Sequence, residues 1–120
     1  MKNNRDFSED LMTVLMVSEK VPSNMQFPVL LDKESEEEDI AQFIDSQRAN
    51  NALHRSSIFT AKQLMNAFDK LDNIRNLGSK SVKEVKNSFM NWYYSSLDDN
   101  KVKEFWSDFV TMNNITAIAR

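Results

Sequence analysis

The chain is 120 residues long and contains one glycine, two prolines and no cysteine, with a formal net charge of −3. This length is enough for one hydrophobic core and too short for a multi-domain enzyme. The absence of cysteine excludes a disulfide framework and a thiolate metal site. No apolar run is long enough to cross a bilayer, so we expect a cytoplasmic protein without a membrane partner.

Charge is distributed unevenly along the sequence. Residues 1–45 carry four basic and eleven acidic side chains, a net charge of −7. Residues 46–96 carry eight basic and three acidic side chains, net +5, and residues 97–120 carry three and four, net −1. A basic segment between acidic flanks is typical of a module that binds a polyanion. The pattern predicts an acidic N-terminal extension, a central binding module and a C-terminal helix.

The N-terminal part predicts a helix followed by an extended connector. Residues 8–20 predict a helix capped by Ser8, with one apolar face made of Phe7, Leu11, Val14 and Leu15. Pro22 and Pro28 cannot continue that helix. From the connector we expect three side chains to pack on the core, namely Val29, Leu30 and Leu31.

The acidic run at residues 34–39 predicts the first turn of a second helix, because carboxylates there complement the helix dipole. This helix would carry Ile40, Phe43 and Ile44. The run lacks the alternating oxygen ligands and the central glycine of a calcium loop, so we expect no metal site.

From Ser46 the sequence predicts short helices separated by polar turns, over residues 46–56, 59–68, 71–78 and 79–94. Their expected core consists of Leu53, Ile58, Leu64, Leu71, Ile74, Leu77, Val82, Val85 and Phe89, with Met90 placed off the apolar face. A last amphipathic helix follows Asp98 or Asp99 as the cap, and its apolar stripe is Val102, Phe105, Trp106 and Phe109. The predicted fold is an all-α, compact bundle of short helices with extra N-terminal and C-terminal helices.

Gly78 is the only glycine, and it precedes a lysine-rich helical pattern. Ser81 and Glu84 have the spacing of a capping box, and Ser79 is a rival cap. One interpretation is a tight turn that needs positive φ, or a helix N-terminus that another backbone approaches closely, with Lys80 beside it. The alternative is that Gly78 simply ends the preceding helix.

No motif in the sequence indicates catalysis. His54 is the single histidine, and the sequence contains no P-loop, no G-x-G-x-x-G and no H-E-x-x-H. A lone histidine is typical of a surface or half-buried position. We therefore expect a non-enzymatic protein without a cofactor or a metal.

Two separated motifs carry a family resemblance. RANNAL at residues 48–53 and IRNLGSKSVKEVK at residues 74–86 together resemble the C-terminal domain of the bacterial RNA polymerase α subunit, a helical module related to helix-hairpin-helix folds. The resemblance covers residues 46 to about 90. It implies DNA binding in the minor groove of A/T-rich sequence, with contacts from Arg48, Asn51, Gly78, Lys80 and Ser81.

The chemistry of these five residues agrees with that assignment. Arg48 and Asn51 are three positions apart and share a helix face. Arginine suits a narrow, electronegative groove, and asparagine can donate to acceptors on the groove floor. Helix-start amides, Lys80 and the Ser81 hydroxyl can bind phosphate oxygens, and Gly78 leaves room for the strand.

The sequence departs from the family at several places. Ser57 and Lys62 stand where the family usually has glycine, which predicts a reshaped turn, and one residue is missing between Thr60 and Ile74. The large N-terminal domain of an α subunit does not fit into 45 residues, so we expect a free-standing relative.

Three functions remain open from the sequence. The first is a small DNA-binding protein acting in transcription. The second is an interaction module that binds RNA polymerase, a σ factor or a regulator, with little DNA binding. The third is an accessory domain for DNA repair or processing. The net charge of −3 favours the second, whereas the intact set of five DNA-contacting positions favours the first.

Overall fold

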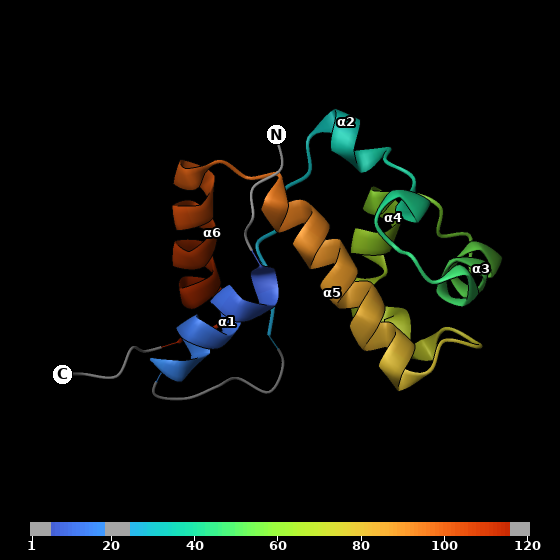
Figure 1. Cartoon of the computed structure of the whole chain (residues 1–120), viewed down its shortest axis with the longest axis horizontal. Coiled ribbons are helices and arrows are strands. Elements are labelled where there is room, and N and C mark those ends of the chain that lie inside the picture. Colours follow the sequence, from blue (N-terminus) through green and yellow to red (C-terminus); the bar gives the residue numbers. More distant parts are fainter. Residues whose placement is uncertain (1–5, 19–24, 116–120) are drawn as a thin grey trace. The chain divides into compact units, whose positions relative to one another are not determined.

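The computed structural model describes residues 6–18 and 25–115 (Figure 1). In these ranges the secondary-structure elements are helices, and an isolated bridge joins Asp39 and Thr60. The α-helices are α1 (Phe7–Met16), α2 (Lys33–Glu36), α3 (Gln47–Arg55), α4 (Ala61–Asn66), α5 (Ser79–Ser95) and α6 (Asp99–Met112). Two 3-10 helices are η1 (Ile40–Gln42) and η2 (Phe68–Asn73). The predicted all-α fold is confirmed.

The protein forms two compact units. One contains residues 31–92, and the other combines residues 1–30 with residues 93–120. The first unit holds both motifs that resemble the α C-terminal domain. It also includes the acidic run, which we expected to belong to an N-terminal extension. The functional division at residue 46 stays a prediction.

The core of the unit formed by residues 31–92 agrees with the prediction at all positions except one. Ile74 is only half-buried, whereas the other eight predicted side chains are buried. Met90, expected off the apolar face, is 1% exposed, because α5 is covered on more than one side. Further buried side chains, absent from the predicted core, are Ile40, Ile44, Ala49, Ala52 and Ala61. Ile40 and Ile44, which follow the acidic run at residues 34–39, therefore supply part of this core.

The acidic run does not form the start of one helix. It is divided into α2, capped by Asp32, and η1, capped by Asp39. Between these helices the backbone turns toward α4: Ala61 N–H donates to the Glu38 carbonyl at 2.9 Å, and Ile40 N–H donates to the Phe59 carbonyl at 3.1 Å. These main-chain bonds fix the segment beside α4 (Figure 1), so its backbone cannot continue as a helix.

Left-handed backbone conformations occur at serine and asparagine instead of glycine. Ser57, Asn76 and Asn114 have φ of 63°, 68° and 53°, whereas Gly78 does not have positive φ. After α3, Ile58 N–H donates to the Leu53 carbonyl at 2.9 Å, and Ser57 N–H donates to the His54 carbonyl at 3.0 Å. This is the Schellman pattern, which normally uses glycine at the position of Ser57. Ser57 thus adopts the left-handed conformation that glycine usually supplies in this pattern, and whether the turn differs from that of the family stays a prediction.

Gly78 begins α5 without strain. Its carbonyl accepts the N–H of Val82 at 2.9 Å, which makes Gly78 the N-cap and places Ser79 and Ser81 inside the first turn. Neither serine is the cap that we predicted. The preceding 3-10 helix ends at Asn73, so Gly78 does not end it either.

The other unit is held by aromatic packing. Phe7 is 3% exposed, and its ring lies 5.5 to 6.1 Å from four other rings, which belong to Phe27, Tyr94, Phe105 and Trp106. Phe109 stacks on Phe27 with a centroid distance of 5.5 Å. The predicted α6 stripe is therefore part of a core, and Asp98 is the cap of α6, as one of the two alternatives predicted.

Three details of the N-terminal prediction are wrong. The first is the helix end, because α1 ends at Met16 with Val17 as its C-cap, whereas the predicted helix extends to residue 20. The cap of α1 is Asp6, whose carboxylate accepts from Glu9 N–H at 3.2 Å, and Ser8 lies inside the helix. Leu30 is 84% exposed and does not pack on the core, whereas Val29 and Leu31 are half-buried. Residues 19–24, which hold the end of the predicted helix and the first part of the connector, lie outside the described residues.

Candidate nucleic-acid interface

Helix α3 is positioned by its own N-terminus. The Ser46 hydroxyl accepts from Ala49 N–H at 3.1 Å, and the Asn50 side-chain amide donates to the carbonyls of Ile44 at 2.8 Å and Ser46 at 3.0 Å. One side of the helix is buried through Ala49, Ala52 and Leu53. The opposite side is thereby fixed toward solvent.

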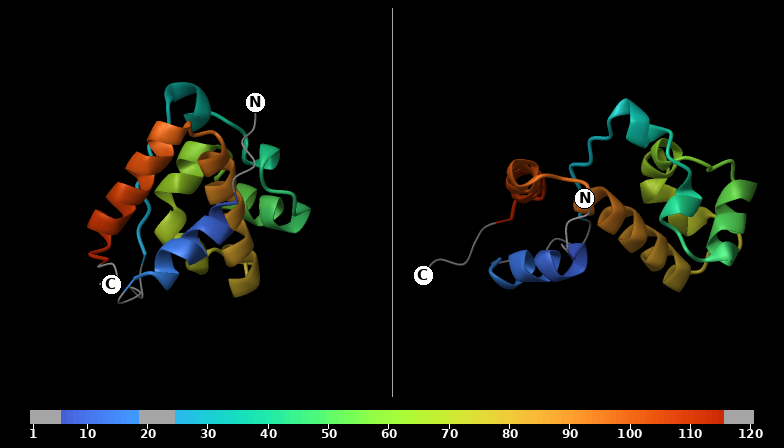
Figure 2. Two further views of the ribbon diagram at one scale, coloured as in Figure 1. Left: turned by 60° about the vertical axis from the view of Figure 1, so that its left-hand side comes forward. Right: turned by 45° about the horizontal axis from the view of Figure 1, so that its top comes forward.

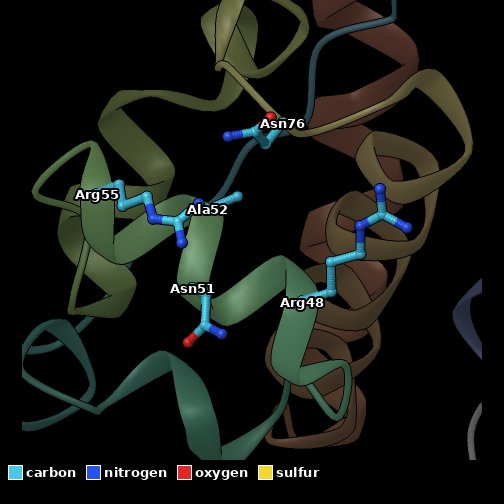
Figure 3. A pocket seen from close by; sticks show the side chains of 5 residues that line it. All are labelled: Arg48, Asn51, Ala52, Arg55 and Asn76. Carbon is cyan, nitrogen blue, oxygen red and sulfur yellow. The ribbon is translucent and has the colours of Figure 1, made fainter.

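An open depression of about 410 Å³ lies along the exposed side of α3. Arg48, Asn51, Ala52 and Arg55 line it from the helix, and Asn76 lines it from the loop that precedes α5. The four helix positions have the spacing of neighbours on one face. In Figure 3 the two arginine side chains lie on either side of Ala52, and Asn76 lies on the loop facing it.

The two guanidinium groups are available to an external anion. Arg48 and Arg55 are exposed, and neither has a carboxylate within ion-pair distance among residues 6–18 and 25–115. On α2, Glu36 instead pairs with Lys62 of α4, with Oε2 and Nζ 3.5 Å apart. The N-terminal end of α5 lies at the opposite end of this unit from α2 in every view (Figures 1 and 2). The acidic segment and the cations near the start of α5 are thus spatially separated.

The first turn of α5 presents backbone donors to solvent. Within the described part of the protein, the N–H groups of Ser79, Lys80 and Ser81 have no acceptor. Such groups at a helix N-terminus form an anion-binding site together with the positive end of the helix dipole. The Lys80 side chain is exposed and the Ser81 side chain is half-buried. These donors all lie within the first turn of α5.

Nothing in the protein itself requires glycine at position 78. A Cβ atom built there meets no atom within 4 Å, and the backbone does not have positive φ. Two physical reasons for glycine remain: its preference over alanine at a helix N-cap, and close approach by a group outside the protein.

The five predicted residues thus fall into two groups. Arg48 and Asn51 lie in the depression, and Gly78, Lys80 and Ser81 lie at the start of α5. Asn76 lines the depression from the loop that leads into α5, so it connects the two groups along the sequence.

Sequence reasoning missed Arg55 and Asn76 as members of this surface. Arg55 could have been found from its spacing, because it lies seven residues after Arg48 and returns to the same helix face. Asn76 could have been found from its conformation, because asparagine is the residue that most readily replaces glycine at positive φ.

His54 packs against an aromatic ring. It is half-buried, and its ring stacks on Phe59 with a centroid distance of 5.0 Å. In the described ranges no three side chains from His, Cys, Asp and Glu are grouped as metal ligands. No helix there combines the length and the apolar character that a membrane span needs.

The fold and this surface define a small, all-helical module that gathers cations and free amides on one side. Residues 31–90 match the family described as the C-terminal domain of the bacterial RNA polymerase alpha chain, and this protein belongs to that family. The family is a transcription-related, non-enzymatic domain for DNA binding and protein interaction. The matched segment nearly coincides with the unit formed by residues 31–92. No curated protein and no solved structure matches the sequence at a significant level.

Proposed function

We propose that this protein binds double-stranded DNA in transcription and does so without enzymatic activity. Arg48 and Asn51 contact the minor groove of A/T-rich sequence, and Gly78, Lys80 and Ser81 bind the phosphate backbone. The cytoplasm is the expected location because DNA and RNA polymerase are found there in bacteria.

The observation that carries this proposal is the unexplained glycine. Gly78 is the sole glycine of the sequence, and its backbone conformation and surroundings would accept a side chain. It also begins the helix whose first three amides lack acceptors within the described residues. The phosphates of a DNA strand passing over this helix start accept hydrogen bonds from the amides. The close approach of that strand explains why residue 78 has no side chain.

The minor-groove assignment rests on the character of the α3 face. Arg48 is exposed and has no carboxylate partner in the described ranges, so no internal ion pair has to be broken before its guanidinium contacts the groove. A narrow A/T-rich groove has an enhanced negative potential that favours arginine. Asn51, three residues later, supplies an amide that can donate to the adenine N3 and thymine O2 acceptors.

The test is a fluorescence anisotropy titration of the full-length protein with two labelled duplexes of equal length, one A/T-rich and one G/C-rich. We expect tighter binding to the A/T-rich duplex and an affinity that falls steeply as salt increases. Binding to neither duplex at low salt would contradict the proposal.

A second candidate function is the binding of RNA polymerase, a σ factor or a regulator. The observation that favours it is exposed apolar surface outside the family match, where Met12, Met16 and Met112 are 60%, 74% and 46% exposed. Methionine adapts readily to partner surfaces. Titration with purified RNA polymerase core and holoenzyme separates the two functions, because this candidate alone predicts binding in the absence of DNA.

A further inference from the structure

Arg55 occupies a position that the five predicted contacts leave unused. It lies two helical turns after Arg48 on the same face of α3 and lines the same depression. The rise of an α-helix separates the two positions by about 10 Å along the axis. The minor groove is about 6 Å wide, which is less than this separation of the two backbone positions.

The depression is lined mainly by cationic and amide side chains. Ala52 is 2% exposed and lies between the two arginines, so the exposed surface there belongs to Arg48 and Arg55 (Figure 3). Arg55 on one side and Asn76 on the facing loop supply N–H donors but no negative charge. Among the residues that α3 contributes to the lining, Asn51 alone carries a side-chain amide, and the other amide, that of Asn76, comes from the loop.

We propose that Arg55 binds a phosphate of the strand that borders the groove occupied by Arg48. This rests on the proposed DNA-binding function and adds a contact to it. The surface then contacts DNA at three points. Arg48 enters the minor groove, Lys80 and the α5 amides bind one phosphate, and Arg55 binds a second phosphate. Arginine suits this role because its planar guanidinium can bond two phosphate oxygens together.

Arg55 also lies in the last turn of α3, where a cation interacts favourably with the helix dipole. A purely structural role predicts that Arg55→Gln lowers thermal stability and leaves DNA affinity unchanged. A phosphate contact predicts a loss of affinity in a protein that remains folded. Thermal melting of each variant therefore accompanies every titration.

The experiment compares the full-length protein with its Arg55→Gln, Arg55→Lys and Arg75→Gln variants on the A/T-rich and G/C-rich duplexes, over a series of salt concentrations. Arg75 is the matched control, because it is exposed, carries the same charge and does not line the depression. We expect Arg55→Gln to weaken binding about tenfold on both duplexes and to lower the salt slope by about one. Arg55→Lys should retain the salt slope, and Arg75→Gln should change the affinity by less than about threefold.

Several outcomes would overturn the assignment. Unchanged affinity of Arg55→Gln, beside a clear loss for Arg48→Ala, would remove Arg55 from the interface and leave the proposed function intact. A selective loss on the A/T-rich duplex would place Arg55 in the groove and not on phosphate. An equal loss for Arg75→Gln would indicate general charge attraction. Failure of the wild-type protein to bind any duplex would contradict the proposed function itself.

Discussion

The phenolic hydroxyl of Tyr94 donates a hydrogen bond to the carboxylate of Asp10, with an oxygen to oxygen distance of 2.6 Å. The same oxygen accepts the indole N–H of Trp106 at 2.8 Å. Tyr94 is 1% exposed, so one buried hydroxyl connects α1, α5 and α6. These polar bonds accompany the aromatic packing around Phe7.

Tyr94→Phe should lower the free energy of unfolding by about 1–3 kcal/mol, because it leaves the Trp106 N–H and the Asp10 carboxylate without their shared partner. Urea denaturation measures the change. Tyr93→Phe is the control: its hydroxyl accepts the Leu30 backbone amide at 3.1 Å, and the Leu30 residue is largely exposed to water. A loss for Tyr93→Phe as large as for Tyr94→Phe would show that the hydrogen-bonded group is not what stabilises this unit.

Ser57→Gly should raise the free energy of unfolding by about 1 kcal/mol, because a non-glycine residue at positive φ is strained there. Ser56→Gly serves as the control, since Ser56 has a φ of −97° and gains nothing from glycine. Thermal or urea denaturation compares the two. If both substitutions changed stability equally, the left-handed conformation of Ser57 would not be the cause.

Gly78→Ala should leave the free energy of unfolding within about 0.5 kcal/mol of the wild type, because a gain from the less flexible unfolded state offsets the poorer N-cap. DNA affinity should fall by about tenfold, since the added methyl group obstructs the close strand. The sequence had suggested a second cost from positive φ, but Gly78 does not adopt it. Full DNA affinity of a stable Gly78→Ala protein would exclude close approach at this position.

Arg48→Ala should cost about 1–3 kcal/mol of binding free energy and reduce the preference for A/T-rich over G/C-rich duplexes. The loss of affinity should depend on the DNA sequence, because the minor groove and not a phosphate attracts the Arg48 side chain. Anisotropy titrations on both duplexes provide the measurement. Equal weakening on the two duplexes would contradict a groove contact.

Lys80→Ala should weaken binding about equally on both duplexes and lower the salt slope by about one, as expected for a phosphate contact. The titrations are repeated over a range of salt concentrations. An unchanged salt slope would exclude phosphate binding by Lys80.

The parts of the fold that were predictable have strong local signals. Helix α6 combines an aspartate cap with an apolar stripe at helical spacing, and both Asp98 and the burial of Phe105 and Phe109 agree with the prediction. Helix α4 is similar, since Thr60 and Gln63 form a complete capping box at the start of a predicted helix. In these segments the sequence pattern and the tertiary packing favour the same backbone.

The features that were missed depend on contacts between distant segments. Ile40 is fully buried because main-chain bonds hold the acidic segment against α4, and charge alone gave no sign of that pairing. The small side chains of Ala49, Ala52 and Ala61 carry a weak periodic signal, although they are buried where helices approach closely. Asn76 belongs to the candidate interface because of its loop conformation, and Arg55 belongs to it because it shares a helix face with Arg48. A comparison of motifs detects neither a loop conformation nor a shared helix face.

The hydrogen bonds that join residues 38–40 to residues 59–61 determine what has to be moved if the module is transplanted into another protein. A graft that began at Ser46 would lose Ile40 from the core, and one that began after residue 35 would lose Asp32, the cap of α2. The portable unit starts at Leu31, and its acidic residues travel with it. A fragment built from these residues would therefore carry the carboxylates of α2, which lie at the opposite end of this unit from the start of α5.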